Sequence, residues 1–473
     1  MSMHIPFDNS YARLPDRFFS RMSPVPVKAP TLLAFNGPLA KELGVTPGPD
    51  DLMAQVFGGN AAPDGADPLA QVYAGHQFGG FSPQLGDGRA HLLGEIVTPD
   101  GRRVDLQLKG SGPTPYSRMG DGRAWLGPVL REYVVSEAMH ALGVPTTRAL
   151  AAVATGEAVY RETGAMPGAV LTRVAASHLR VGTFQYFAAR RDMPGLQALF
   201  DYTVARHAPE AETPADLLKT VIDRQAQLVA QWMSVGFIHG VMNTDNTSIS
   251  GETIDYGPCA FMDQFHPDTV FSSIDAQGRY AFSNQPNVIV WNMAQLATAL
   301  VGLMPDQDAA VSEFTGLVHA MPDRIHGYWL AAYGRKIGIA QATQDDETLI
   351  TDLLQAMAEN GADFTNTFRA LGDGTARDQF TDPAAYNRWE ARWRDRIKSE
   401  ATPFDTMRAA NPAYIPRNHR VEQMIQAAVA GDFRPYDRLM RVLSNPFTRQ
   451  DGAEDLTHPP GPSEVVHRTF CGT

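Results

Sequence analysis

The chain has 473 residues, of which 44% are hydrophobic and 19% charged, and its formal net charge is -12. This composition excludes a globally disordered chain, and the length suits one bilobal enzyme or two to three modules. The negative balance argues against a dedicated nucleic-acid binder, which needs a basic surface to displace counterions from phosphates.

The cysteine content and the N-terminal sequence indicate the compartment. Two cysteines, Cys259 and Cys471, cannot build a disulfide framework or a four-thiolate zinc site, so a reducing compartment is expected. The N-terminal segment lacks the apolar stretch of a secretory signal, and no run of about 18 apolar residues predicts a membrane-spanning helix. We therefore expect a cytoplasmic protein that binds neither membranes nor nucleic acid. The sequence leaves the oligomeric state open, with a monomer as our expectation.

Two segments open the chain. Residues 1–70 are rich in Pro, Gly and Asp and predict an N-terminal extension that wraps the core, with a short helix near Leu39–Leu43. Residues 71–165 predict a small α/β lobe, in which a Thr98–Gly101 turn joins the first two strands. The elements expected in this lobe are the strands Ala90–Val97 and Arg103–Leu108, the helix Gly127–Leu142 and the strand Ala149–Thr155. A further strand, Gly168–Val174, is expected just after it.

Residues 166–450 predict a helical C-terminal lobe that carries catalytic and metal-binding loops, and 451–473 predict a flexible tail. Apolar residues at helical spacing predict helices at Ala215–Val235, Asn292–Leu303, Ala310–Met321, Thr348–Met357 and Val421–Ala430. Strands with one helix, followed by a helical half, predict an α+β, bilobal, protein-kinase-like fold with a nucleotide between the lobes. Periodicity alone does not distinguish this fold from other α+β arrangements.

The strongest local signal is the segment His239–Asn246, which is followed by Asp255-Tyr-Gly257. In kinases the catalytic loop begins His-Arg-Asp or a variant, reaches an Asn, and precedes an Asp-Phe-Gly motif. Asn246 and Asp255 fall at the positions whose oxygens bind magnesium, the hard cation that offsets phosphate charge. The alternative is an Asp/Asn-rich turn between a helix and a strand.

Val241 stands where a kinase has its catalytic Asp. A valine cannot orient or deprotonate a hydroxyl, so either the protein is inactive or another group has taken over. Asp245, which precedes Asn246, is the candidate replacement base.

A lysine ends the strand Val104–Lys109. In kinases a lysine at this place holds ATP phosphates and pairs with a Glu from the helix of the small lobe. The helix that begins near Gly127 offers Glu132 and Glu137, and position favours Glu132 as the partner in a structural ion pair with Lys109. A surface lysine at a strand end is the alternative.

Two glycine turns and two arginines are further candidates for phosphate binding. The turns Gln84–Arg89 and Asp121–Arg123 could wrap backbone N–H groups round a phosphate, although ordinary β-turns have the same composition. Arg173 and Arg180 need anionic partners, and a guanidinium fork suits a triphosphate as well as it suits a nearby carboxylate.

These segments together resemble the selenoprotein O (YdiU) family of protein adenylyltransferases over nearly the whole chain. The segments that carry the resemblance are Phe7–Ser10, Tyr73–Phe81, Gln84–Ala90, Leu108–Arg118, Arg131–His140, Gly240–Asn246, Asp255–Pro258, Ile415–Asn418 and Gly431–Asp432.

The resemblance implies a kinase-like enzyme that binds ATP inverted, so that AMP is transferred to Ser, Thr or Tyr hydroxyls of proteins and pyrophosphate is released. It implies Mg²⁺ or Mn²⁺ bound by Asn246 and Asp255, and Asp245 as the catalytic base. The residues implied to bind the nucleotide are Gly86, Gly88, Arg89, Lys109, Asp121, Gly122, Arg173, Arg180 and Asp255.

A redox link between the C-terminal tail and the segment after the metal-binding loop is associated with this family. Cys471 matches the tail position, but the cysteine expected near Phe271 is absent, and Cys259 is expected to be a small buried thiol. We therefore do not expect redox control.

Three other functions compete with AMP transfer. One is UMP transfer from UTP with manganese, and another is a non-catalytic, nucleotide-binding pseudokinase scaffold, which Val241 favours. Asp245, Asn246 and Asp255 argue against the scaffold, because a scaffold needs neither a base nor metal ligands. An ordinary kinase is the third, weakened by Val241 and by the incomplete glycine loop.

Overall fold

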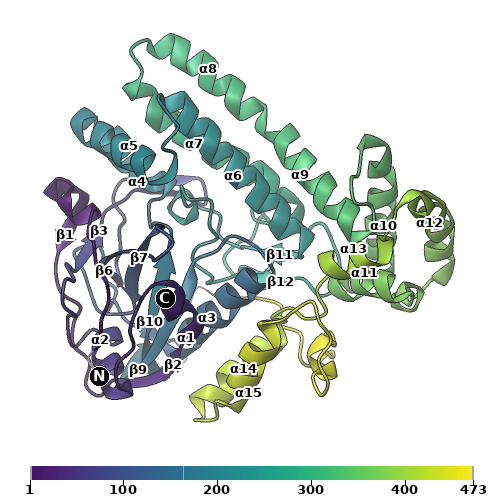
Figure 1. The fold of residues 1–473 in the computed structure, drawn as a ribbon, viewed down its shortest axis with the longest axis horizontal. Coiled ribbons are helices and arrows are strands. Elements are labelled where there is room, and N and C mark those ends of the chain that lie inside the picture. Colours follow the sequence, from purple (N-terminus) through teal and green to yellow (C-terminus); the bar gives the residue numbers. More distant parts are fainter. Residues whose placement is uncertain (1–2, 163, 471–473) are drawn as a thin grey trace.

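A computed structural model describes residues 3–162 and 164–470 and shows an α+β protein (Figure 1). One antiparallel sheet has the strand order β1-β3-β6-β7-β10-β9-β2, and β8 pairs with β10. Its strands are β1 (Phe19–Arg21), β2 (Thr31–Phe35), β3 (Leu69–Gln71), β6 (Ala90–Val97), β7 (Arg103–Lys109), β8 (Ala124–Trp125), β9 (Arg148–Arg161) and β10 (Gly164–Ala175).

The sheet is covered on both faces, so most side chains of its central strands β6 and β7 are buried. On one face, the short helices α1 (Gly37–Glu42) and α2 (Asp50–Phe57) share a core with β6, β7, β9 and β10. On the other, α3 (Leu126–Ala141) packs on β9 and β10. The strands and the helix predicted for this region are confirmed; the bounds of Ala90–Val97 match, and the ends of the others shift.

Residues before β3 reach both edges of the sheet, because β1 lies beside β3 at one edge and β2 lies beside β9 at the other. The helix expected near Leu39–Leu43 is confirmed as α1. Sequence analysis missed the two edge strands, since a Pro-rich segment has little alternation of polar and apolar residues.

The second half of the chain is helical. Its helices are α4 (Val181–Ala189), α5 (Met193–His207), α6 (Pro214–Ser234), α7 (Gln285–Leu300), α8 (Gln307–His319), α9 (Met321–Lys336), α10 (Glu347–Asn360), α11 (Phe364–Asp373), α12 (Pro383–Arg396), α13 (Pro403–Ala410), α14 (Asn418–Val429) and α15 (Arg434–Leu443). The five helices predicted from periodicity are confirmed as α6, α7, α8, α10 and α14. Helix α7 starts earlier than expected because Pro286 sits in its first turn, where its missing N–H costs no hydrogen bond.

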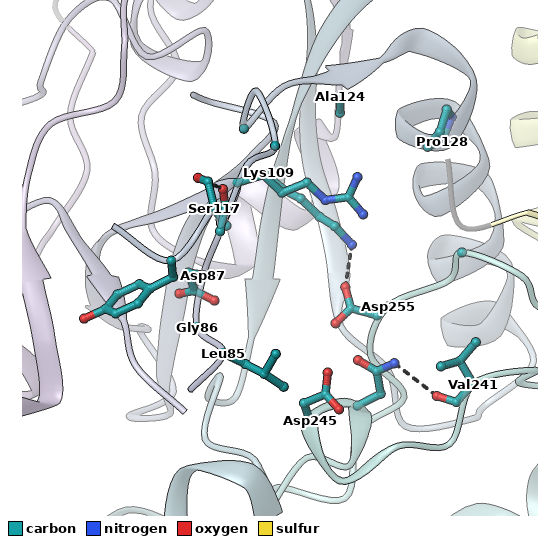
Figure 2. A pocket seen from close by; sticks show the side chains of 18 of the residues that line it. Leu85, Gly86, Asp87, Lys109, Ser117, Ala124, Pro128, Val241, Asp245 and Asp255 are labelled. Carbon is teal, nitrogen blue, oxygen red and sulfur yellow. Dashed lines mark hydrogen bonds and ion pairs between the residues drawn. The ribbon is translucent and has the colours of Figure 1, made fainter. Parts of the chain in front are cut away.

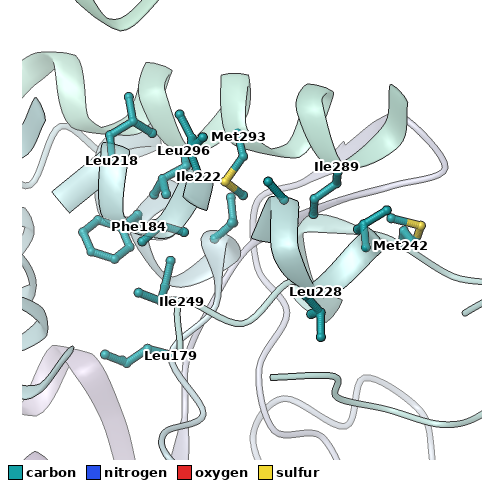
Figure 3. Packing of buried hydrophobic residues seen from close by; sticks show 14 of the residues in the cluster. Leu179, Phe184, Leu218, Ile222, Leu228, Met242, Ile249, Ile289, Met293 and Leu296 are labelled. Atoms are coloured by element: carbon teal, nitrogen blue, oxygen red, sulfur yellow. The ribbon is translucent and has the colours of Figure 1, made fainter. Parts of the chain in front are cut away.

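Helices α4 and α6 both pack against α7, and side chains of the loop that follows α6 join this cluster (Figure 3). Met242 and Ile249, which flank the Thr244–Asn246 turn of this loop, are buried in the same cluster as Leu228 and Met293. The loop is also closed by a short antiparallel pair, β11 (Phe237–Ile238) with β12 (Ala260–Phe261). The irregular backbone between β11 and β12 is therefore anchored to a rigid helical core.

Helix α7 and its flanking turns, Phe282–Leu303, are the one helical stretch in the described part of the chain that is long and apolar enough to cross a membrane. The sequence analysis did not anticipate such a stretch. Its mean hydropathy is 1.2 and 44% of the window is buried. Since α4, α6 and α8 pack against α7, the helix belongs to the core of this fold.

The C-terminal segment is held against the chain that follows the Asp255–Gly257 loop. The Thr469 N–H donates to the Phe271 carbonyl at 2.8 Å, and the Ser273 N–H donates to the Thr469 carbonyl at 3.0 Å. Cys471 lies outside the described residues. Cys259 is a buried free thiol, and burial raises its pKa to about 12, so it is unreactive at neutral pH.

One buried cation gives a stability prediction. Lys336 Nζ lies 4.3 Å from the centre of the Phe368 ring, and burial lowers its pKa to about 7. The native state therefore disfavours the ammonium that the unfolded chain carries. Lys336→Met should raise the free energy of unfolding, with the largest gain below pH 7.

That gain should fall by up to roughly 1.4 kcal/mol per pH unit above pH 7 and vanish near the ordinary lysine pKa. Chemical denaturation at several pH values measures it, and the exposed Lys41→Met is the matched control. A gain that does not change with pH would show that Lys336 is not neutralised by burial.

Candidate active site

A cavity of about 950 Å³ opens between residues of the sheet, α3 and the loops after α6 (Figure 2). Its lining contains every residue predicted from the sequence to bind the nucleotide or the metal, to act as the base, or to pair with Lys109. These are Gly86, Gly88, Arg89, Lys109, Asp121, Gly122, Glu132, Arg173, Arg180, Asp245, Asn246 and Asp255. Segments that are far apart in the sequence thus converge on one cavity.

The lining is positively charged although the chain is acidic. Seven Arg and Lys side chains and five carboxylates line the cavity, in a protein whose net charge is -12. The cations are Arg89, Lys109, Arg118, Arg123, Arg161, Arg173 and Arg180. This local excess suits a polyanionic ligand such as a polyphosphate.

Lys109, at the end of β7, lies at the centre of a buried ion network. Its Nζ is 2.6 Å from Glu132 Oε2 on α3 and also contacts Asp255 Oδ1. Arg173, on the neighbouring strand β10, lies 2.8 Å from Asp255 Oδ1 and 3.2 Å from Glu132 Oε1. The β7–β10 register places Arg173 opposite Gln107, whose Oε1 accepts from Arg173 at 2.7 Å.

Arg180, the residue before α4, is a third buried cation and is only 2% exposed. Its guanidinium lies 3.6 Å from Asp87 Oδ1 and 3.7 Å from Asp255 Oδ2, and it stacks over the Tyr73 ring at 4.3 Å. These contacts are longer than hydrogen bonds. Arg180 is therefore held in place yet keeps donors for a ligand.

Asp255 has an unusual backbone and an unusual environment. Its φ is +66°, in the left-handed region that Asp tolerates better than most side chains. Burial opposes ionisation, but Lys109, Arg173 and Arg180 outweigh burial and hold the pKa of Asp255 well below its usual range. The carboxylate is ionised at any physiological pH.

Asp245 and Asn246 lie in a short 3-10 turn, Thr244–Asn246. The Asn246 amide donates to the Val241 carbonyl at 3.0 Å, which leaves the amide oxygen free. Asp245 Oδ2 accepts from Gln77 Nε2 at 3.0 Å, and Oδ1 is buried without a donor. Burial is the main cause that raises the pKa of Asp245 to about 6.

The glycines of the two turns are required by close packing. Gly86 has φ +140°, and a Cβ there would lie 2.5 Å from the Tyr116 ring; at Gly88 it would lie 2.8 Å from the Tyr116 carbonyl oxygen. Gly122, at φ +66°, would place a Cβ 2.2 Å from the Gly112 backbone. Asp121 lies 2.8 Å from Arg161 and is half exposed, at the rim rather than the centre of the charge network.

The sequence analysis missed several polar residues of this site. Asp87 lies inside the turn Gln84–Arg89, of which only Gly86, Gly88 and Arg89 were predicted to bind the nucleotide. Gln107 belongs to a stripe on β7 with Asp105 and Lys109, and polar residues at alternate positions of a buried strand are a signal that could have been used. Gln77 lies in the segment Tyr73–Phe81, which carries part of the family resemblance, but nothing in that segment indicates its contact with Asp245.

The donor set fits a magnesium or manganese ion. Among the described residues no group of three or more His, Cys, Asp or Glu is arranged to hold a metal. The Asp255 carboxylate and the free amide oxygen of Asn246 nevertheless face one cavity. Two hard oxygen ligands suffice for magnesium when substrate phosphates and water supply the others.

Comparison with known proteins gives the family. Residues 2–444 match the family described as "Protein adenylyltransferase SelO". Proteins named "Protein nucleotidyltransferase YdiU" are 64% identical in Ruegeria pomeroyi and 55% identical in Bradyrhizobium diazoefficiens, each over 100% of both chains. A further one from Jannaschia sp. is 60% identical over 99% of both chains. The chain belongs to the SelO family of nucleotidyltransferase enzymes.

Proposed function

We propose that this protein binds ATP in the 950 Å³ cavity and transfers AMP to Ser, Thr or Tyr hydroxyls of acceptor proteins. The observation that carries the proposal is the convergence of Lys109, Arg173 and Arg180 with Asp245, Asn246 and Asp255 on one cavity. The match to a family described as protein adenylyltransferases supports it. A sheet with α3 on one side of the site and helices on the other also supports a bilobal, kinase-like arrangement.

The buried cations fit the inverted binding of ATP that the family resemblance implies. Arg173 and Arg180 are each 2% exposed, so they would meet the terminal phosphates at the closed end of the cavity. Such enclosed guanidinium groups stabilise phosphate charge strongly because little water competes with them. The α-phosphate would then lie toward Asp245 and the acceptor.

In this mechanism the acceptor hydroxyl oxygen forms a bond to the α-phosphorus. The bond from that phosphorus to the α,β-bridging oxygen breaks, and pyrophosphate leaves with the electron pair. Asp245 takes the hydroxyl proton, since a carboxylate with a pKa near 6 is ionised at neutral pH and is a stronger base than an ordinary Asp. Val241, which is buried, takes no part in proton transfer.

Asn246 and Asp255 would hold the divalent cation, which when bound neutralises phosphate charge. Before any ligand binds, Asp255 is the counterion of Lys109, Arg173 and Arg180. Phosphates that enter the cavity would replace Asp255 as the partner of these cations, and the carboxylate would become available to the metal.

Labelled nucleotides test the reaction. With ATP labelled at the α-phosphate and Mg²⁺ or Mn²⁺, we expect label on the protein itself and on unfolded casein as a generic acceptor. ATP labelled at the γ-phosphate should leave both unlabelled, because the γ-phosphate leaves in pyrophosphate. Transfer from the γ-position would indicate a kinase, and no transfer from either position would indicate a scaffold. A parallel arm with α-labelled UTP measures UMP transfer.

A substitution at Asp255 tests the metal assignment. Asp255→Ala should lower α-label transfer by more than about 100-fold, because charge stabilisation of several kcal/mol is lost. With EDTA present, the same variant should bind ATP at least as tightly as the wild type, since Lys109, Arg173 and Arg180 lose a competing carboxylate.

Isothermal titration measures the affinity, and the exposed Asp345→Ala is the matched control. Full activity of Asp255→Ala would show that the metal assignment is wrong. Weaker metal-free binding would show that the carboxylate does not compete with phosphate.

A further inference from the structure

A small hairpin outside the main sheet lies against the loop that carries Asp245. Its strands are β4 (Gly75–Gln77) and β5 (Gly80–Ser82). The His76 N–H donates to Thr244 Oγ1 at 2.6 Å, Gln77 Nε2 donates to Asp245 Oδ2 at 3.0 Å, and the Phe78 N–H donates to Asn243 Oδ1 at 3.1 Å. Three successive hairpin residues thus bind three successive loop residues.

The same hairpin confines both oxygens of the Asp245 carboxylate. Gln77 holds Oδ2, and the Gly75 backbone lies so close that a Cβ there would be 2.9 Å from Oδ1 and 3.0 Å from Asp245 Cβ. Oδ1 is buried. Since Asp245 lines the cavity, Oδ2 is the oxygen that can reach a ligand, and a carboxylate oxygen has a second lone pair for one.

The hairpin is itself rigidly supported. Gln185, on α4, donates to His76 Nδ1 at 2.8 Å and accepts from Thr244 Oγ1 at 2.7 Å, so one side chain fixes both hairpin and loop. Phe78 has φ 51°, a left-handed conformation that a bulky residue rarely adopts. Strain of this kind persists where surrounding contacts impose it, and it is common at functional sites.

We propose that Gln77 is a positioning residue, which orients Asp245 Oδ2 toward the acceptor hydroxyl. This inference rests on the proposed function, because it gives Gln77 a role only if Asp245 is the base. A short acidic side chain on an irregular turn has two rotatable bonds, and Gln77 with Gly75 removes that freedom. A reacting group displaced by about 1 Å can lose roughly 100-fold in rate.

The test compares Gln77→Met, which keeps the side-chain length but removes the donor, with Gln77→Glu, which adds a repelling carboxylate. Both should lower kcat for α-label transfer to casein by about 10- to 100-fold, with Gln77→Glu the lower, while KM for ATP stays within about twofold. Gly75→Ala should cause a similar loss by pushing Asp245 from the other side. The exposed Gln55→Met is the control, and thermal melting checks that each variant is folded.

A double-mutant cycle shows whether Gln77 acts through Asp245. In an Asp245→Asn background, Gln77→Met should cause no further loss of the residual transfer, because the group that it positions is gone. If Gln77→Met keeps full kcat while Asp245→Asn is inactive, or if the two losses multiply, the inference about Gln77 is wrong and the proposed function stands. If Asp245→Asn keeps full kcat, the proposed base is wrong and the inference fails with it.

Discussion

Asp255 and the three cations round it are the interaction on which the site depends. Lys109 comes from β7, Arg173 from β10, and Arg180 from the turn before α4, and Asp255 contacts all three. Separately, each of these charges would be costly to bury. Together they offset one another's charge, and Asp255 is the counterion that holds the three cations round one point of the cavity.

Elements from several parts of the fold hold this cluster in place. The β7–β10 register fixes Lys109, Gln107 and Arg173 side by side. Helix α3, which packs on one face of the sheet, supplies Glu132. The β11–β12 pair closes the loop that carries Asn246 and Asp255, and Met242 and Ile249 anchor that loop in the helical core. Neither half of the molecule contains all the charged groups.

Much of this arrangement could be predicted from the sequence, for physical reasons that differ by element. Long amphipathic helices such as α6 can be predicted because apolar residues recur at helical spacing. The β6–β7 hairpin can be predicted because a turn sequence joins two segments rich in apolar residues. Lys109, Asn246 and Asp255 could be predicted because they stand at positions that match the phosphate-binding and metal-binding residues of kinase motifs. Helix α12 was missed although Tyr386, Trp389 and Trp393 lie on one buried face, because charged residues fill the positions between them.

Other features could not be predicted because they arise only from tertiary contact. Gln77 acts on a residue 168 positions later in the chain, and no local pattern relates the two. The edge strands β1 and β2 are short and lie among prolines, and each is fixed by pairing with one neighbouring strand that is distant in the sequence. The raised pKa of Asp245 and the depressed pKa of Asp255 likewise follow from burial and neighbours, not from residue type.

An experimental structure with Mg²⁺ and an ATP analogue that resists cleavage between the α- and β-phosphates would test how these groups bind the nucleotide. We expect the triphosphate in the cavity, with its terminal phosphates on Lys109, Arg173 and Arg180, the cation on Asn246 and Asp255, and the α-phosphorus nearest Asp245. A nucleotide bound elsewhere, or one whose γ-phosphate faces Asp245, would contradict this expectation.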